Sequence, residues 1–130
     1  MRASLPAGVA WPRSLRGATA SAWRRIAHGV RWSRVTLADA AANVYLLRVA
    51  AGKVLPEHSH RGGELTQVLH GAFHDGDERF AAGDFDEADD SVHHQPVVAT
   101  CGECICRTSV EGRVAFDGAI ARVLGSLLGM

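Results

Sequence analysis

Three residues of types that commonly bind metal ions lie close together near the middle of the chain. His58 and His60 are separated by one residue, and Glu64 follows four residues after His60. Alternate side chains of a β-strand point to the same face, so the two imidazoles project together if this segment is extended. Two imidazoles and one carboxylate suit a borderline divalent metal such as zinc, iron, nickel or manganese. We therefore predict a metal site with these three residues as ligands.

The same segment, which runs from Gly52 to Gly71, resembles the first motif of the cupin superfamily. Its pattern Gly-x5-His-x-His-x3-Glu-x6-Gly matches that motif at every position. The second cupin motif is Gly-x5-Pro-x-Gly-x2-His-x3-Asn, and here only Gly83 and His94 match it. The resemblance implies His94 as the fourth metal ligand. His93 is the alternative, because neighbouring strand residues face opposite ways and only one of the two can reach the interior.

The composition indicates one domain without an overall bias towards nucleic acid. The chain has 130 residues, the usual length of a single domain, and its 14 basic and 14 acidic residues balance. Residues 1–34 nevertheless contain seven arginines and no acid. We interpret this start as a solvated segment or a face that docks on the acidic remainder, since a transit peptide would need an amphipathic helix. No apolar stretch reaches the ~18 residues of a membrane span, so we expect a cytoplasmic protein that binds neither membrane nor nucleic acid directly.

Short strand-like runs separated by Gly and Asp turns predict an all-β sandwich or barrel. Together with the cupin motif, they imply a double-stranded β-helix, a jelly-roll barrel whose interior side chains can face a site. Residues 1–22 lack steady periodicity and are expected to be an irregular or flexible lead within this single domain of residues 1–130. The expected strands are Val35–Leu37, Asn43–Val49, Glu64–His70, Gly71–His74, Glu78–Phe80, Asp84–Glu87, Gln95–Thr100, Cys104–Ser109 and Arg113–Phe116.

The C-terminus changes to a helical period. Residues 117–129 are expected to form an α-helix that Asp117 caps. Its role is to cover an open edge or end of the barrel, or alternatively to bind a partner. The apolar residues at helical spacing are Phe116, Ile120, Val123, Leu124, Leu127 and Leu128.

The chain has three cysteines, Cys101, Cys104 and Cys106. An odd number argues against a disulfide scaffold and favours a reducing compartment. Cys104 and Cys106 share a strand face and are awkward to join by a disulfide. We interpret all three cysteines as buried apolar residues, with a redox-responsive thiol as the alternative. His70 has the same strand parity as Glu64, which places it on the barrel rim or in the cavity behind the metal ligands.

Three segments, EHSHRGGELTQVLHGAF, DERFAAGDFDEADDSVHHQPV and CICR, resemble the cupin-like domain of ChrR-type anti-sigma factors. The resemblance covers roughly residues 23–130. It implies zinc held by His58, His60, Glu64 and His94, and a response to singlet oxygen or organic hydroperoxides that releases an extracytoplasmic-function sigma factor. That family binds its sigma factor through a separate N-terminal zinc domain with its own His and Cys-x-x-Cys ligands. Residues 1–34 contain only one histidine and no cysteine, so we expect the sensing half alone, as a fragment or as a stand-alone relative.

Two functions are compatible with these features. The first is a metal-binding sensory module without enzymatic activity, in which zinc stabilises the barrel and the C-terminal helix is the element that changes state. Its expected partner is a sigma factor or a separate sigma-binding domain, and self-association as a homodimer is left open. The second is a small metalloenzyme, such as a cupin dioxygenase, that uses the same four ligands with iron, nickel or manganese. The family resemblance favours the sensory module.

Overall fold

The computed structural model describes residues 4–36, 43–54, 64–88 and 96–110. Within these ranges the chain forms ten β-strands and one short 3-10 helix, so the all-β prediction is confirmed there. The elements are η1 (Arg13–Leu15), β1 (Thr19–Ala20), β2 (Arg24–Ala27), β3 (Val30–Thr36), β4 (Asn43–Val49), β5 (Glu64–His70), β6 (Ala72–Asp75), β7 (Glu78–Ala81), β8 (Phe85–Ala88), β9 (Val97–Val98) and β10 (Cys104–Val110).

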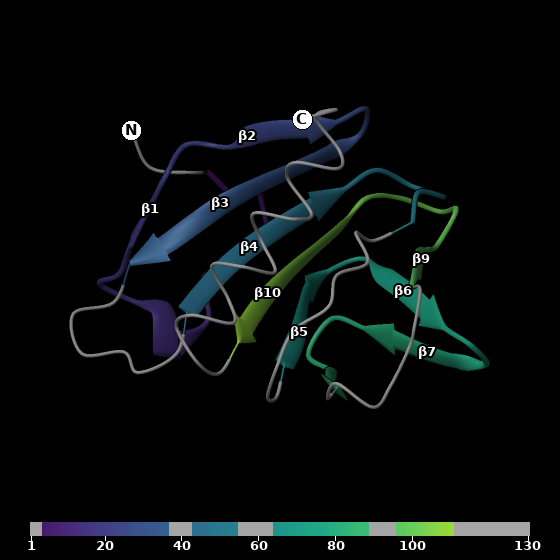
Figure 1. Ribbon diagram of the computed structural model, residues 1–130. Helices are drawn as coiled ribbons and strands as arrows, with labels where there is room; N and C mark the ends of the chain where they lie inside the picture. The colour runs from purple at the N-terminus through teal and green to yellow at the C-terminus, as the bar shows by residue number, and fades with distance from the viewer. Residues whose placement is uncertain (1–3, 37–42, 55–63, 89–95, 111–130) are drawn as a thin grey trace.

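The strands form two antiparallel sheets (Figure 1). The larger sheet has the order β1-β3-β4-β10-β5-β8, with β2 also paired to β3, and the smaller sheet has the order β7-β6-β9. In Figure 1, β3, β4, β10 and β5 run side by side, and β6, β7 and β9 are grouped next to β5. Strand β10 pairs with β4 on one side and with β5 on the other. It therefore connects the first half of the chain to the strand that begins at Glu64.

The first hydrophobic core lies between the two sheets. Phe73 of β6 and Val98 of β9 enter it from the smaller sheet, and each is only 1% exposed. The Phe73 ring also stacks on Phe80 of β7, with 5.1 Å between ring centroids. Side chains from both sheets thus share one interior, as in a jelly roll. The buried members of this core are Ile26, Val30, Tyr45, Leu47, Val49, Val68, Phe73, Val98, Cys104 and Cys106.

A second hydrophobic core lies on the opposite face of the larger sheet, because the N-terminal segment crosses that face. Leu15 of η1 is fully buried against it. Trp11 and Trp23 pack at its margin. The segment is also held by polar contacts, since the Ser33 hydroxyl donates to the Ser21 carbonyl oxygen at 2.6 Å. The buried members of this second core are Leu15, Ala18, Ala20, Val35, Val44 and Leu46.

Most of the predicted strands are confirmed in the described residues. Two predictions, Asn43–Val49 and Glu64–His70, match the observed bounds of β4 and β5. One of the expected Gly and Asp turns lies at Asp75 and Gly76, where it joins β6 to β7 and Gly76 adopts a φ of 63°. Strands β1 and β2 were not predicted, and β3 begins at Val30, five residues before the predicted strand. Their short or arginine-rich sequences lack the alternation that identifies a strand.

Several predictions fall on residues outside the described ranges. The α-helix over residues 117–129 and the strand Arg113–Phe116 both lie there, as do the expected metal ligands His58, His60 and His94.

Candidate metal centre

Of the four predicted ligands, only Glu64 belongs to a described element, and there through its backbone. It is the first residue of β5, where it pairs with Val110 of β10 on one side and with Ala88 of β8 on the other. His58, His60, His94 and the alternative His93 lie outside the described residues. The ligand set therefore remains a prediction from the sequence.

The pairing of Glu64 with Ala88 nevertheless fixes where the two histidine-bearing segments attach to the sheet. Residues 55–63 carry the two first-motif histidines and lead directly into Glu64, the start of β5. Residues 89–95 carry His93 and His94 and follow Ala88, the last residue of β8. Since Glu64 and Ala88 are register partners, both histidine-bearing segments are anchored at the same end of the barrel.

A polar row lies next to this end on the interior face of the larger sheet. Tyr45 pairs with Thr108, Thr108 with Thr66, and Thr66 with Asp86, so the four residues form a line across β4, β10, β5 and β8. Tyr45 and Thr108 are each only 1% exposed. Thr66 and Asp86 are half-buried. Hydroxyl and carboxyl groups in such a position suit the orientation of metal ligands by hydrogen bonds. Sequence analysis missed this row because it depends on the register of four strands that are distant in the chain.

His70 does not share the interior face with Thr66 and Val68. The pairing of β5 with β10 shifts after Val68, so that His70 faces Ile105 rather than a cysteine. Ile105 in turn pairs with Arg48, which places His70 on the outer face. The option that His70 lines the metal cavity is therefore wrong, because this bulge breaks the two-residue alternation on which it depends.

The prediction of buried cysteines is confirmed for Cys104 and Cys106 and is wrong for Cys101. Cys104 and Cys106 are buried and Cys101 is exposed, and all three are free thiols. The sulfur atoms of Cys104 and Cys106 lie 3.5 Å apart. Hydrogen bonding to Cys104, followed by burial, raises the pKa of the Cys106 thiol well above its ordinary value, so it stays protonated. Cys106 pairs with Val68, four residues along β5 from Glu64 and therefore roughly 13 Å away.

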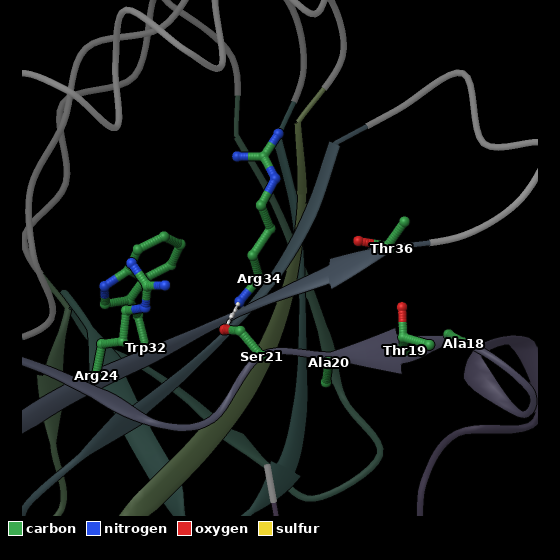
Figure 2. Close-up of a pocket in the computed structure, with 8 residues that line it drawn as sticks. All are labelled: Ala18, Thr19, Ala20, Ser21, Arg24, Trp32, Arg34 and Thr36. Carbon is green, nitrogen blue, oxygen red and sulfur yellow. Dashed lines mark hydrogen bonds between the residues drawn. The ribbon is translucent and has the colours of Figure 1, made fainter. Parts of the chain in front are cut away.

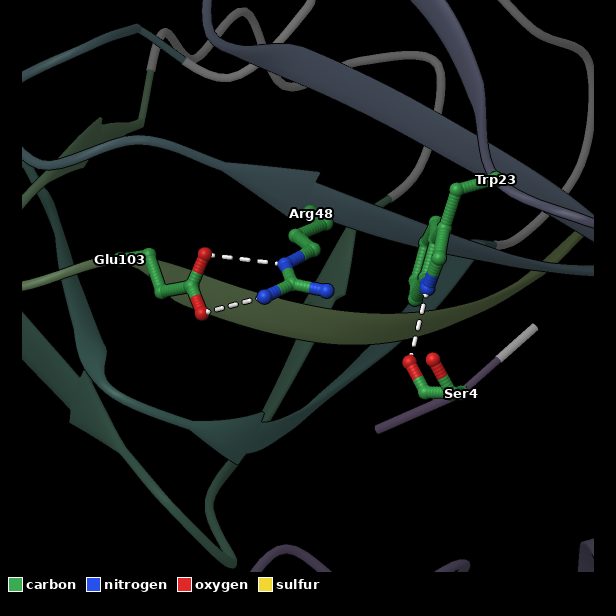
Figure 3. Close-up of polar contacts among 4 residues, drawn as sticks. All are labelled: Ser4, Trp23, Arg48 and Glu103. Carbon is green, nitrogen blue, oxygen red and sulfur yellow. Dashed lines mark hydrogen bonds and ion pairs between the residues drawn. The ribbon is translucent and has the colours of Figure 1, made fainter. Parts of the chain in front are cut away.

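A polar cluster on the outer face was also missed by sequence analysis (Figure 3). Arg48 of β4 donates two hydrogen bonds to the Glu103 carboxylate, both at 2.9 Å. Its guanidinium also lies over the Trp23 ring, 5.8 Å from the centroid, and the Trp23 indole N–H donates to the Ser4 carbonyl oxygen at 2.8 Å. The hydrogen bonds from Arg48 lower the pKa of Glu103 despite its partial burial. This cluster ties the N-terminal segment to β4 and to the start of β10.

Two further features are absent from the described part of the chain. Within it, no three histidine, cysteine, aspartate or glutamate side chains are grouped so that they could hold a metal ion. No helix in residues 4–36, 43–54, 64–88 and 96–110 has the length and hydrophobicity to cross a membrane.

The two sheets, their shared core and their strand order define a cupin-like protein. An RmlC-like cupin from Ralstonia eutropha superposes with a TM-score of 0.58 over 75% of this chain and 65% of that chain. At 20% identity, this match shows likeness of fold alone.

More specifically, the chain belongs to the ChrR cupin-like domain family, whose model matches residues 13–112. The anti-sigma-E factor ChrR of Cereibacter sphaeroides is 36% identical over 102 residues, which are 78% of this chain and 47% of that protein. The crystal structure of Rhodobacter sphaeroides SigE in complex with the anti-sigma ChrR matches with a TM-score of 0.63 and 40% identity, over 68% of this chain and 48% of that chain. The chain thus spans about half the length of these relatives.

Proposed function

We propose that this chain is the metal-binding sensory module of a ChrR-like regulator of transcription. In this proposal His58, His60, Glu64 and His94 hold a zinc ion at the end of the barrel where β5 begins. Oxidants such as singlet oxygen or organic hydroperoxides disturb that site in the cytoplasm, and the disturbance reaches an extracytoplasmic-function sigma factor. The membership of the ChrR cupin-like family supports the regulatory role, and the relative's complex with SigE suggests the kind of partner.

The observation that carries the metal site is the register of Glu64 with Ala88. This register attaches the two histidine-bearing segments to adjacent strands at the same end of the barrel, which supports a site that their side chains share. A bound zinc ion would supply a cation that joins these two segments. The neighbouring row of Tyr45, Thr66 and Thr108 has hydroxyl groups that can orient the metal ligands by hydrogen bonds. Because the ion would join ligands on separate segments, metal binding would contribute directly to the stability of this end of the barrel.

Elemental analysis of the purified full chain tests the ligand assignment. We expect about one zinc ion per chain, as for a single site with four protein ligands. His60→Ala should lose most of the metal and unfold at a lower temperature. His74→Ala is the matched control, because His74 lies exposed on β6, and it should retain the parent's zinc content. Metal binding by His60→Ala that is as tight as the parent's would show that the assignment is wrong.

Two further variants distinguish the alternatives for the fourth ligand. His94→Ala should lose zinc, and His93→Ala should keep it. The reverse pattern would assign His93 as the ligand and leave the remainder of the site unchanged.

The sensory role is tested by exposing the zinc-loaded protein to singlet oxygen from an illuminated dye, with a chromogenic zinc indicator present. We expect zinc release that depends on both light and oxygen. The competing function, a cupin dioxygenase, predicts a different result. A protein that contains iron and consumes oxygen when substrate is added would contradict the sensory function and support the enzymatic one.

A further inference from the structure

A hollow of about 540 Å³ opens at the edge of the larger sheet, where β1 and β2 both pair with β3. Figure 2 shows that the side chains of Arg24, Trp32 and Arg34 rise on one side of the strands, while Ala20 points to the other side. Trp32, Arg34 and Thr36 alternate along β3 and so share one face. The volume falls within the range of known small-molecule sites. The lining residues are Ala18, Thr19, Ala20, Ser21, Arg24, Trp32, Arg34 and Thr36.

Two arginine side chains line the hollow. Arg24 and Arg34 both contribute to its wall, and the first 36 residues of the chain, from which it is built, contain no aspartate or glutamate. Arg24 places its guanidinium over the Trp32 ring, 5.9 Å from the centroid. This stacking holds the Arg24 guanidinium at the wall of the hollow, where its N–H groups can donate hydrogen bonds to a carboxylate.

The hollow also has an apolar wall and neutral polar groups. The Trp32 ring is half-buried and packs against the first hydrophobic core, which fixes its position as one wall. Thr19 and Thr36 are register partners on β1 and β3 and add hydroxyl groups at the far end. The Ser21 hydroxyl is already used by the fold, because it accepts a hydrogen bond from the Arg34 backbone N–H at 3.0 Å. The Ser21 hydroxyl therefore stabilises the strands that form the hollow and is not expected to bind a ligand.

We propose that this hollow binds a small organic anion, namely a carboxylate with a flat, apolar body. The guanidinium group of Arg24 would bind the carboxylate of this ligand. The body would lie against Trp32, since aromatic faces pack favourably on flat apolar groups. None of the lining residues is a proposed metal ligand, although Arg34 is the register partner of Tyr45 in the polar row. In this proposal the domain binds an organic anion in addition to a metal ion, and a regulatory module could respond to either ligand.

Titration of the full-length protein with benzoate tests this site, with benzamide as the neutral compound of the same shape. Binding is followed through the indole N–H signals in nitrogen-15 NMR spectra. The Trp32 signal should shift with benzoate and much less with benzamide. Trp11 and Trp23 pack at the margin of the second hydrophobic core, on the opposite face of the larger sheet. They serve as internal controls whose signals should stay in place. Equal binding of the two compounds, or equal shifts at all three indoles, would overturn the proposal.

Matched arginine variants test the residue assignment. Arg24→Gln should weaken benzoate binding about tenfold, because a hydrogen-bonded charge pair contributes at least that factor. Arg25→Gln is the control: Arg25 is the next residue and also exposed, but it contacts His28 and does not line the hollow. Its affinity for benzoate should equal that of the parent. Inorganic phosphate provides a third arm, and phosphate binding as tight as that of benzoate would show that Trp32 takes no part, contradicting the proposed ligand class.

Discussion

Arg48 and Glu103 form a bidentate ion pair that joins β4, in the middle of the larger sheet, to the turn before β10. Nε of Arg48 lies 2.9 Å from one carboxylate oxygen and Nη2 lies 2.9 Å from the other. The side chains are 23% and 34% exposed, so the pair is neither fully solvated nor buried. Arg31 and His70 add favourable charge interactions with the same carboxylate. The outer face thus holds a cationic cluster around one acid.

Replacement of Glu103 by glutamine should lower the free energy of unfolding by about 1 kcal/mol at neutral pH, the upper range for a partly exposed ion pair. The pH dependence has a defined sign. Since Arg48 lowers the pKa of Glu103 below its ordinary value of 4.5, the ion pair stabilises the fold above that value and is lost as the pH falls through the lowered pKa.

Urea unfolding of the parent and of Glu103→Gln between pH 7 and pH 3 measures this effect. The difference between the two proteins should shrink below about pH 4.5. Glu87→Gln changes an exposed carboxylate on β8 and provides the control, with a difference near zero at neutral pH. A Glu103→Gln effect that grows towards acid pH would contradict the assigned ion pair.

Gly71 makes a close approach that no other residue type can reproduce. Its φ is 77°, and a Cβ atom built there would lie 2.1 Å from the Glu103 carbonyl oxygen. Gly71→Ala should therefore destabilise the protein by more than about 2 kcal/mol, which combines backbone strain with a steric clash.

Gly76→Ala separates these two causes. Gly76 has a similar φ of 63°, but an added Cβ would meet no atom within 4 Å. Only the backbone term applies, so we expect a loss of about 1 kcal/mol. Thermal unfolding of both variants measures the difference, and equal losses would show that the contact with Glu103 is unimportant.

The N-terminal segment should contribute to stability through Leu15. This side chain is fully buried on the outer face of the larger sheet. Leu15→Ala should lower the free energy of unfolding by about 2–4 kcal/mol, as expected for a large-to-small change in a core. Arg16→Ala alters the adjacent exposed residue and should change stability by less than about 0.5 kcal/mol. If both variants unfold like the parent, the segment does not pack as described.

Removal of the buried thiols should leave the metal content unchanged. Cys104→Ala combined with Cys106→Ala is expected to lower stability through lost packing, by about 1–3 kcal/mol. Zinc content by elemental analysis should equal that of the parent, because Cys106 lies four residues along the barrel from the proposed site. Loss of zinc from a folded double variant would place a thiol among the ligands.

The sequence by itself determined the elements whose pattern is local. The strand Glu64–His70 alternates in its own residues, and Asn43–Val49 is rich in branched and aromatic side chains, so both could be bounded without knowledge of their neighbours. The spacing of His58, His60 and Glu64 is likewise a local property, and it carried the metal prediction and the family resemblance. The burial of Cys104 and Cys106 followed from strand parity and composition.

Only the tertiary structure decided features that depend on strand pairing. Parity along β5 predicts one face for Glu64, Thr66, Val68 and His70, but the bulge against β10 moves His70 to the other face. The outer core around Leu15, the ion pair of Arg48 with Glu103, and the stacking of Arg24 on Trp32 join residues from different elements. A chain encodes such contacts through register and packing between distant segments, and a one-dimensional pattern does not specify either of them.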